Sequence, residues 1–538
     1  LMIDFPYIGI IIFGKYNYFR TFARYFSFTK THYPIIMKHC IFFLLYSFIF
    51  ATYAQKPNVI IIVADDLGYG DLSCYGEKTI HTPQVASLAK QGMVFTNVHS
   101  TAATCTPSRY SLFTGLYNWR RNDTGIAPGD AAMVIRPEQT TIADVFKAAG
   151  YTTGAIGKWH LGLGGERGKQ DWNGFITPGP SDIGFEYSCI MAATADRVPC
   201  VWIENQRVAN YDPSAPIEVS YNLPFEGEPT GKNNPELLTK LKPSLHHGHD
   251  QAIVNGISRI GYMKGGGNAL WTDEHLADTI VAKTVKYIEN HKSQPFFLYV
   301  GTNDIHVPRY PNPRFVGKSG MGYRGDAILQ FDWTVGEIVK ALKANKLYDN
   351  TLIIITSDNG PVIDDGYQDQ AEELLGRHRP WGAFHNHGGK YSNYEAGTRV
   401  PFIVRYPKIV KKGTSDALLS HIDLFASLSK FIGAEIPAGA ATDSEDYLKA
   451  FLGKDKKGRP YVIASGGALS ITDGRWKYVV PSDNPSYQPL TRTHLGNYPE
   501  PRLYDLKEDI MELYNVAKDH PEELTRLKTM LDNIKNRK

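Results

Sequence analysis

A cysteine followed at fixed spacing by proline and arginine marks one place where this chain could do chemistry. Residues 105–109 read Cys-Thr-Pro-Ser-Arg, and a short amphipathic run at 110–114 follows. Proline is favoured in the first turn of a helix, so Cys105 is predicted at a helix N-terminus, where an anion is stabilised. Arg109, one turn further on, can point back to the same place. The pattern predicts a site that holds an oxyanion against a nucleophile. The alternative interpretation is a helix start with a buried cysteine and no function. Residues 105–109 considered alone favour this alternative.

Oxygen donors follow two apolar runs that lie far apart in the sequence. Continuous apolar runs such as 59–63 and 351–356 are typical of strands buried in a parallel sheet. Each run ends in a pair of oxygen donors: Asp65 and Asp66 after the first, Asp358 and Asn359 after the second. Open α/β sheets bind ligands at the carboxyl ends of such strands. A set of oxygens without cysteine partners suits Ca²⁺ or Mg²⁺ rather than zinc.

Cations and imidazoles follow further predicted strands. A strand at 151–156 is followed by Lys158 and His160, which an extended chain places on the same side. A second apolar strand, at 295–302, leads to His306. Each of these patterns is weak in isolation, and their value depends on whether the fold brings them together.

Apolar runs alternate with predicted helices along most of the chain, which is typical of an α/β fold with a mostly parallel sheet. The predicted helices cover residues 82–92, 140–149, 271–290, 323–345 and 422–432. After about residue 437 the pattern changes to short strands and a terminal helix, at 461–465, 468–472, 476–480, 503–505 and 521–536. We therefore expect a catalytic domain at 55–436 and a small C-terminal α+β subdomain at 437–538, with an antiparallel sheet and a helix.

A long segment between the predicted strands lacks regular periodicity. Residues 163–270 are rich in Gly, Pro, Asn and His, and are predicted to form an insertion that covers the site. His246, His247 and His249 within it have the composition of a metal cluster. A histidine run on a surface loop is the simpler interpretation of these three residues.

The first residues of the chain carry a targeting pattern. Met37 opens a short basic region, an apolar run at 40–50 is too short to span a bilayer, and small residues end at Ala54. We expect a signal peptide at 37–54 and interpret residues 1–36 as an upstream extension that is not native. A membrane anchor built from both stretches is the alternative. The signal peptide predicts a protein exported to the periplasm or secreted, or associated with the cell surface, without stable membrane insertion after cleavage.

Charge and cysteine usage exclude some classes of protein. The formal net charge is +3 over 538 residues, so nothing indicates a nucleic-acid partner. Of the 5 cysteines, Cys40 would leave with the signal peptide and Cys105 is set apart. An odd number remains, namely Cys74, Cys189 and Cys200, so no disulfide framework is predicted. The spacing nevertheless allows a Cys189–Cys200 bridge in an oxidising compartment.

Six separated stretches together resemble the formylglycine-dependent, type I sulfatases of the alkaline phosphatase superfamily. In the family's order they are residues 63–68, 105–109, 157–162, 306–308, 357–360 and 389–401. One departure is visible, because the family often has Glu-Gly-Gly where this chain has Glu395-Ala396-Gly397. The resemblance extends from about residue 58 to about residue 516. It implies an alkaline-phosphatase-like fold and sulfate ester hydrolysis, and it is strongest to bacterial polysaccharide and glycosaminoglycan sulfatases.

The resemblance implies that Cys105 is oxidised after translation to formylglycine by a maturation enzyme that reads its motif. The hydrated aldehyde offers two hydroxyls. One attacks sulfur while the alcohol leaves, and the other helps to eject sulfate by C–O cleavage and regenerates the aldehyde. An unmodified thiol lacks the second hydroxyl and would stall as a covalent adduct.

The resemblance also implies a metal set and a catalytic set. The metal ligands would be Asp65, Asp66, Asp358, Asn359 and the modified Cys105, and the family's ion is usually Ca²⁺, with Mg²⁺ less favoured. Arg109, Lys158 and Lys390 would surround the sulfate with positive charge. His160 would act as the base for the second hydroxyl, and His306 would protonate the leaving oxygen, although the reverse assignment stays open.

The expected substrate is a sulfated saccharide, from host glycosaminoglycans and mucins or from algal glycans. Arg197, Trp202, His385 and His387 lie in stretches that could line a sugar subsite, and a structural role fits each equally well. Two other functions stay open. One is a phosphodiesterase or phosphonate monoester hydrolase of the same superfamily, and the other is a non-catalytic protein that binds sulfated glycans.

Overall fold

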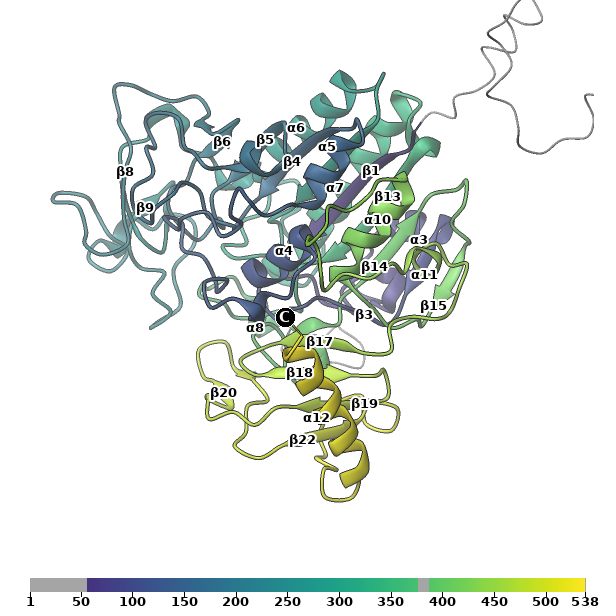
Figure 1. Cartoon of the computed structure of the whole chain (residues 1–538). Helices are drawn as coiled ribbons and strands as arrows, with labels where there is room; N and C mark the ends of the chain where they lie inside the picture. Colours follow the sequence, from purple (N-terminus) through teal and green to yellow (C-terminus); the bar gives the residue numbers. More distant parts are fainter. Residues whose placement is uncertain (1–55, 376–386, 538) are drawn as a thin grey trace, which may run out of the picture. The chain divides into compact units, whose positions relative to one another are not determined.

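The computed structural model describes residues 56–375 and 387–537, and the chain from Lys56 onward forms one compact unit (Figure 1). The predicted signal peptide and upstream extension, Cys40 and His385 lie outside the described residues. Among the residues that are described, no helix is both long enough and apolar enough to cross a membrane.

A 10-stranded sheet forms the centre of the fold, in the order β15-β2-β14-β13-β1-β12-β4-β5-β6-β7. Its strands are β1 (Asn58–Ala64), β2 (Met93–Phe95), β4 (Thr152–Lys158), β5 (Tyr187–Met191), β6 (Trp202–Glu204), β7 (Arg207–Val208), β12 (Phe296–Gly301), β13 (Thr351–Ser357), β14 (Phe402–Arg405) and β15 (Gly413–Ser415). Strands β13, β1, β12, β4 and β5 run parallel. Strand β14 pairs antiparallel with β13, β6 pairs antiparallel with β5, and β7 pairs antiparallel with β6. The predicted α/β fold with a mostly parallel sheet is therefore confirmed.

The central strands are apolar along their whole length because both faces of the sheet are covered. Every residue of β1 and β13 is buried, and Ile61 pairs with Tyr299 on one side and with Ile354 on the other. Helices α3 (Pro83–Gln91), α6 (Leu276–Asn290) and α7 (Gly322–Ala344) pack together on one face, and α4 (Cys105–Thr114), α5 (Ile142–Ala148) and α10 (Leu424–Ile432) on the other (Figure 1).

Helix α4 differs from its prediction in one respect. It begins at Cys105 as expected, but the run 110–114 is not amphipathic, because all 10 residues of the helix are buried. The helix packs against α5 and α10, and its end contacts the turn that precedes α10, so no side is left to solvent. Gly115, with a φ of 64°, ends it in the left-handed conformation that glycine adopts readily.

The C-terminal region contains the predicted antiparallel sheet and helix. Strands β17 (Val462–Ser465), β18 (Leu469–Thr472), β19 (Trp476–Val479) and β22 (Arg502–Asp505) form a 4-stranded sheet in that order, and α12 (Pro521–Lys535) packs against it. We call these strands the C-terminal sheet. A short hairpin of β20 (Tyr487–Gln488) and β21 (Thr493–His494) leaves the sheet between β19 and β22.

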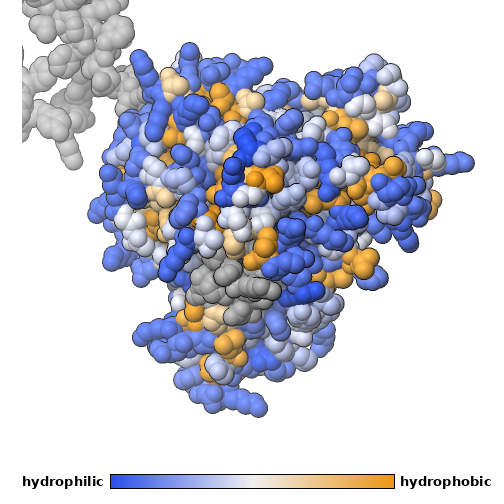
Figure 2. Space-filling model, turned by 180° about the vertical axis from the view of Figure 1, so that it is seen from behind, coloured by the Kyte–Doolittle hydropathy of each residue, from blue (hydrophilic) through white to orange (hydrophobic). Residues whose placement is uncertain are grey.

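The segment 163–270 contains only short elements beyond β5, β6 and β7, as its composition predicts. Its further strands are β8 (Glu218–Ser220), β9 (Ile253–Val254), β10 (Ile257–Ser258) and β11 (Tyr262–Lys264). Cys189 and Cys200 are free, buried thiols, so the bridge that the spacing allowed is absent. Figure 2 shows one face of the molecule, where hydrophilic side chains dominate and apolar ones form small separate groups.

Candidate active site

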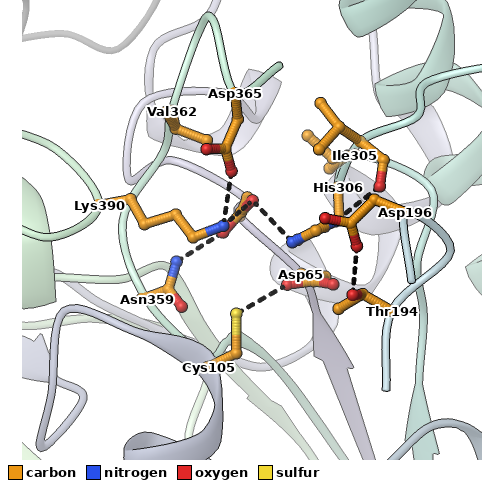
Figure 3. Close-up of polar contacts among 12 residues, drawn as sticks. Asp65, Cys105, Thr194, Asp196, Ile305, His306, Asn359, Val362, Asp365 and Lys390 are labelled. Atoms are coloured by element: carbon orange, nitrogen blue, oxygen red, sulfur yellow. Dashed lines mark hydrogen bonds and ion pairs between the residues drawn. The ribbon is translucent and has the colours of Figure 1, made fainter. Parts of the chain in front are cut away.

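Side chains from four distant parts of the sequence meet at the carboxyl edge of the central strands. Asp65 and Asp66 follow β1, Asp358 follows β13, and Lys158 is the last residue of β4. The parallel arrangement places the carboxyl ends of these strands at one edge of the sheet. Helix α4 starts at Cys105 beside this edge, and Cys105 points toward Asp65 (Figure 3).

Cys105 is buried and protonated. Its side chain is 2% exposed, and its Sγ donates to Oδ1 of Asp65 at 3.6 Å. Burial raises the pKa of the Cys105 thiol well above its usual range, although Lys158 opposes this effect. The thiolate is the nucleophilic form of cysteine, so the thiol in this environment is not activated for attack.

Two buried cations lie beside Cys105 and are fixed by carboxylates. Arg109 donates from Nε and Nη2 to Oδ2 of Asp358 at 3.0 and 2.7 Å, and from Nη1 to the Lys158 carbonyl at 3.2 Å. The Nζ of Lys158 donates to Oδ2 of Asp65 and lies 3.9 Å from Oδ2 of Asp358. The positive charges are therefore held in place before any ligand binds.

A third cation, Lys390, lies between two carboxylates (Figure 3). Its Nζ is 2.9 Å from Oδ2 of Asp66 and 2.9 Å from Oδ2 of Asp365. Burial alone would lower the pKa of Lys390, but Asp365 and Asp66 raise it well above its usual range. The Tyr391 hydroxyl also donates to Asp365, at 3.2 Å. Lys390 is therefore charged and held on both sides.

The carboxylates themselves are crowded. One potential ligand atom from each of Asp65, Asp66, Asp358 and Cys105 lies within 4.8 Å of the others. Burial raises the pKa of Asp65 to about 7, and burial also raises that of Asp66. Burial alone would raise the pKa of Asp358 too, but Arg109 and Lys158 hold it below its usual value. The cluster therefore carries a repulsion that a cation would relieve.

Asn359 completes this group with an oxygen that lacks a partner. Its Nδ2 donates to Oδ1 of Asp66 at 2.7 Å, whereas its buried Oδ1 accepts no hydrogen bond from any described residue. A buried carbonyl oxygen of this kind needs an explanation, and a hard divalent cation beside the carboxylates satisfies it. The donor set fits Ca²⁺ or Mg²⁺, because it contains oxygens and no imidazole.

Two neutral histidines contribute to the site. His160 donates from Nε2 to the Ala127 carbonyl at 2.9 Å, and its buried Nδ1 has no partner within the described chain. His306 donates from Nδ1 to the Val307 carbonyl at 2.8 Å, and its Nε2 lies 3.9 Å from Oδ2 of Asp66. Burial, followed by nearby lysines, lowers the pKa of both rings well below the usual value. Each imidazole therefore offers one nitrogen lone pair.

A cavity of about 280 Å³ connects these groups to a second set of residues. We define its floor as the lining residues Cys105, His160, Asp365, His306 and Lys390, together with the buried cluster described above: Arg109, Lys158, Asp65, Asp66, Asp358 and Asn359. We define its rim as the other lining residues: Ile126, Asp196, Arg197, His247, His249, Ile260, Tyr391, Gln488, Leu490 and Thr491. The rim comes from the segment 163–270, from the loop after α4, from the Lys390 loop and from the β20–β21 hairpin.

An ionised aspartate organises part of the rim. Asp196 accepts hydrogen bonds from Nη1 of Arg197 at 3.0 Å and from Nε2 of His249 at 3.1 Å. Burial alone would raise the pKa of Asp196, but Arg197 and His249 hold it well below its usual range. Arg197 was a sugar-subsite candidate from the sequence, and it does line the cavity.

The structure places the other candidates for the rim in different ways. The histidine run is not simply a surface feature, because His249 is buried and both His247 and His249 line the cavity, whereas His246 is exposed. Trp202 packs against Trp271 and is only 8% exposed, and it does not line the cavity. His387 donates to the Met511 carbonyl at 2.8 Å and is also absent from the lining. His385 lies outside the described residues.

Sequence reasoning missed several residues of the site. Asp365 and Tyr391 escaped notice although each lies close in sequence to a motif, Asp365 after Asp358 and Tyr391 directly after Lys390. A search for acids and phenols next to the motifs would have found them. Asp196, Gln488 and Thr491 carry no such local signal, because only the tertiary fold brings them to the cavity.

The fold and the floor define a sulfatase. The family model described as Sulfatase matches residues 57–434, and the chain belongs to this family. An N-acetylgalactosamine-6-O-sulfatase of Bacteroides thetaiotaomicron is 54% identical over 486 residues, which cover 90% of this chain and 94% of that protein. Human arylsulfatase A is 29% identical over 499 residues, covering 89% of this chain and 87% of that protein.

A solved structure supports the same assignment. It is described under the metabolism of multiple glycosaminoglycans by Bacteroides thetaiotaomicron, and it matches with a TM-score of 0.87 and 53% identity over 90% of this chain and 100% of that one. The protein is therefore an enzyme that hydrolyses sulfate esters. Of the functions that the sequence left open, sulfate ester hydrolysis is the one these findings support.

Proposed function

We propose that this protein removes the 6-O-sulfate from N-acetylgalactosamine units of glycosaminoglycan fragments, with Cys105 converted to formylglycine and a divalent cation bound beside it. The 54% identity to an N-acetylgalactosamine-6-O-sulfatase over 90% of this chain supports the proposed substrate. The observation that carries the chemistry is the floor of the cavity, where Cys105 lies beside Lys390 and two neutral imidazoles, with Arg109 and Lys158 fixed in the buried cluster next to it.

The proposed nucleophile is the hydrated aldehyde of residue 105. Burial raises the pKa of the encoded Cys105 thiol, so the unmodified residue is a poor nucleophile in this position. One hydroxyl of the hydrate attacks sulfur and the sugar alcohol leaves. The second hydroxyl then loses its proton, the C–O bond to sulfate breaks, and the aldehyde returns.

Fixed positive charge would stabilise the transition state. Arg109, Lys158 and Lys390 are buried and anchored by carboxylates, so their orientation needs no reorganisation when the sulfate binds. Negative charge spreads over the sulfate oxygens as the S–O bond to the sugar breaks. The anchored cations would lie next to these sulfate oxygens at the floor of the cavity.

A cation would be held by the carboxylates of Asp65, Asp66 and Asp358, by Oδ1 of Asn359, and by an oxygen of the modified residue 105. Bound there, it would supply Lewis-acid chemistry that lowers the pKa of the hydrate and neutralises sulfate oxygens. Carboxylate and amide oxygens favour Ca²⁺, which tolerates irregular coordination, over Mg²⁺, which demands an octahedron.

The two histidines supply proton transfer in this proposal. His160 takes a proton from the second hydroxyl at Nδ1, the nitrogen that has no partner among the described residues. His306 gives a proton to the leaving oxygen from Nε2. An anionic ester in the cavity would offset the charges of Lys158 and Lys390, which lower the pKa of these rings, and would bring His306 closer to its protonated form.

The rim would bind the sugar. The guanidinium of Arg197 uses Nη1 for Asp196 and Thr194, whereas its Nη2 donates to no described residue and would donate to a sugar hydroxyl in the cavity. Such a contact would be made to the leaving group rather than to the sulfate.

We also propose that the protein is exported, as the targeting pattern at 37–54 indicates, and that a maturation enzyme converts Cys105. The division into a catalytic domain at 55–436 and a C-terminal subdomain at 437–538 belongs to the same proposal. The change from a mostly parallel to an antiparallel sheet supports that boundary.

Sulfate release from a panel of defined saccharides tests this function. The panel contains N-acetylgalactosamine 6-sulfate, N-acetylgalactosamine 4-sulfate and N-acetylglucosamine 6-sulfate, and the enzyme is co-expressed with a maturation enzyme. We expect preferential turnover of the first compound and the mass of formylglycine in the peptide across residue 105. Equal or faster turnover of either other sugar would contradict the proposed substrate, and a dominant phosphodiesterase activity would contradict the proposed chemistry.

A further inference from the structure

The C-terminal region holds the loop that carries Lys390. Within residues 390–395, Asn393 donates from its backbone to the Leu495 carbonyl at 2.8 Å and from Nδ2 to Oδ1 of Asn497 at 2.7 Å. The backbone N–H of Ala468, which precedes β18, donates to Oδ1 of Asn393 at 3.2 Å. All polar groups of the Asn393 side chain are thus occupied by one region of the chain.

A buried ion cluster holds the end of the same loop. Lys477, in β19, lies with Nζ 3.1 Å from Oε1 of Glu395 and 2.9 Å from Oε1 of Glu512. The backbone N–H of Glu395 donates to Oε2 of Glu512 at 2.5 Å, so Glu512 binds the first residue of the short helix α9 (Glu395–Thr398). The side chains of these three residues are at most 3% exposed.

Close backbone packing leaves the loop little freedom against the C-terminal sheet. A Cβ atom at Gly466 would lie 2.3 Å from the carbonyl oxygen of Ser392 and 2.5 Å from its carbonyl carbon. Only glycine permits this approach, because any side chain there would push the loop away. On its other side the loop is held by the Lys390 contacts with Asp66 and Asp365 and by the Lys390 N–H, which donates to the Pro361 carbonyl at 2.8 Å.

We infer that Lys477, through Glu395 and Glu512, is a positioning residue for catalysis: the C-terminal sheet sets where the Nζ of Lys390 stands in the cavity. Lys477 does not line the cavity and is not among the possible metal ligands, and its ion-pair partners among the described residues are Glu395 and Glu512, so its effect on turnover is expected to pass through the loop. This inference rests on the proposed role of Lys390. It makes the C-terminal region part of the catalytic machinery rather than an attachment to it.

The loop provides a short mechanical path for this effect. The anchored Glu395 lies five positions after Lys390, and Asn393 is anchored between them. Removal of Lys477 leaves two buried carboxylates facing each other, which repel and would displace the start of α9. Displacement by about 1 Å is enough to reduce turnover by about 10²-fold where groups must be held in a reactive geometry.

The test compares Lys477→Met with a matched control, Arg459→Met. Arg459 is also a buried cation of the C-terminal region, paired with Asp423 at 2.5 Å, but it has no contact with residues 390–395. Turnover is measured on N-acetylgalactosamine 6-sulfate and on 4-nitrophenyl sulfate, with Tm measured for each variant. We expect both variants to lower Tm, but only Lys477→Met to lower kcat/KM, by about 10–100-fold on both substrates. Lys477→Arg, which keeps the cation, should recover most of this loss.

A double-mutant cycle separates positioning from general destabilisation. In a Lys390→Ala background, Lys477→Met should cause little further loss, because the group that it positions is already gone. Additive losses, or equal kinetics of Lys477→Met and Arg459→Met, would overturn the inference. If Lys477→Met does not fold, Asn497→Ala, which removes one hydrogen bond to Asn393, takes its place in the same cycle, with the same criteria.

The two proposals fail in different ways. Wild-type turnover by Lys390→Ala would refute the proposed role of Lys390 itself. An impaired Lys390→Ala together with a Lys477→Met that behaves like Arg459→Met would leave that role intact and refute only the positioning by Lys477.

Discussion

The floor and the rim of the cavity are held together by different means. Floor groups such as Lys158 and Lys390 are anchored to carboxylates at strand ends of the central sheet, by buried ion pairs. Rim groups such as Arg197 and Gln488 stand on loops and a short hairpin, where few regular hydrogen bonds fix them. In the proposed function the floor acts on the sulfate, which every substrate shares, whereas the rim contacts the sugar and can vary with it. Substitutions in the floor and in the rim should therefore have different effects on turnover.

The largest effect is expected at the floor, from Cys105→Ala. Alanine cannot be converted to formylglycine, so no hydrate forms, and sulfate release should fall by at least about 10⁴-fold on every substrate because the nucleophile is absent. Tm should change little, since the methyl group of alanine fits the space of the buried thiol. Initial rates on N-acetylgalactosamine 6-sulfate and on 4-nitrophenyl sulfate measure this, and survival of either activity would show that residue 105 is not the nucleophile.

Removal of the divalent cation should come next, and its effect should depend on pH. In cation-free protein, burial holds the pKa of Asp65 near 7 instead of 3.8, so the folded state binds more protons than the unfolded chain between these values. Stability should then fall as pH rises through that window, and turnover should drop by about 10²-fold or more.

Scanning calorimetry at several pH values, in chelator and with added Ca²⁺, measures this effect. Ca²⁺ should restore turnover and flatten the dependence of Tm on pH. Identical profiles with and without the ion would mean that the carboxylate cluster of the floor does not bind it.

At the rim, Arg197→Ala should impair the turnover of a sulfated sugar more than the turnover of a sulfate ester without a sugar. We expect kcat/KM on N-acetylgalactosamine 6-sulfate to fall by about 10–100-fold, because a charged hydrogen bond to the leaving group is lost. Turnover of 4-nitrophenyl sulfate, which has no sugar, should change by less than about threefold. Arg207→Ala removes an exposed arginine of the same segment and serves as the control. Equal losses of kcat/KM on both substrates would contradict a contact between Arg197 and the sugar, and would indicate that Arg197 acts on the sulfate.

The smallest kinetic effect is expected from Trp202→Phe. Trp202 packs against Trp271 outside the cavity, so the substitution should cost about 1–2 kcal/mol of stability through lost packing and leave KM for the sugar unchanged. Parallel denaturation and saturation curves measure both quantities. A raised KM for the sugar without a change in stability would indicate that Trp202 contacts the sugar after all.

The same comparison explains how much the sequence could predict. The floor was largely predictable, because apolar runs identify buried strands and parallel strands place their carboxyl ends together. Asp65, Asp358 and Lys158 each follow or end such a run, so sequence pattern and position in space coincide. The central sheet and the C-terminal sheet were predictable for the same reason.

The rest required tertiary structure. The burial of the whole of α4 could not be read from its mixed composition, because it depends on what packs against each side. His249 carries no local signal that it will bind Asp196, and the β20–β21 hairpin reaches the cavity only through the packing of the C-terminal region. Cys189 and Cys200 are close in sequence, but the fold keeps them as separate thiols, which spacing alone could not decide.

Because residues of the site lie far apart in the sequence, they are synthesised at different times. Arg109 lies 249 residues before Asp358, the carboxylate that holds it, and β13 follows the start of α4 by a similar stretch. At about 5–20 residues per second of synthesis, the partner is made roughly 12–50 s after Arg109. During that interval β1 lacks one of its neighbours, and the pocket that buries residue 105 is incomplete. A nascent chain therefore passes through a timed window in which this side chain is still accessible, and completion of the sheet closes that window.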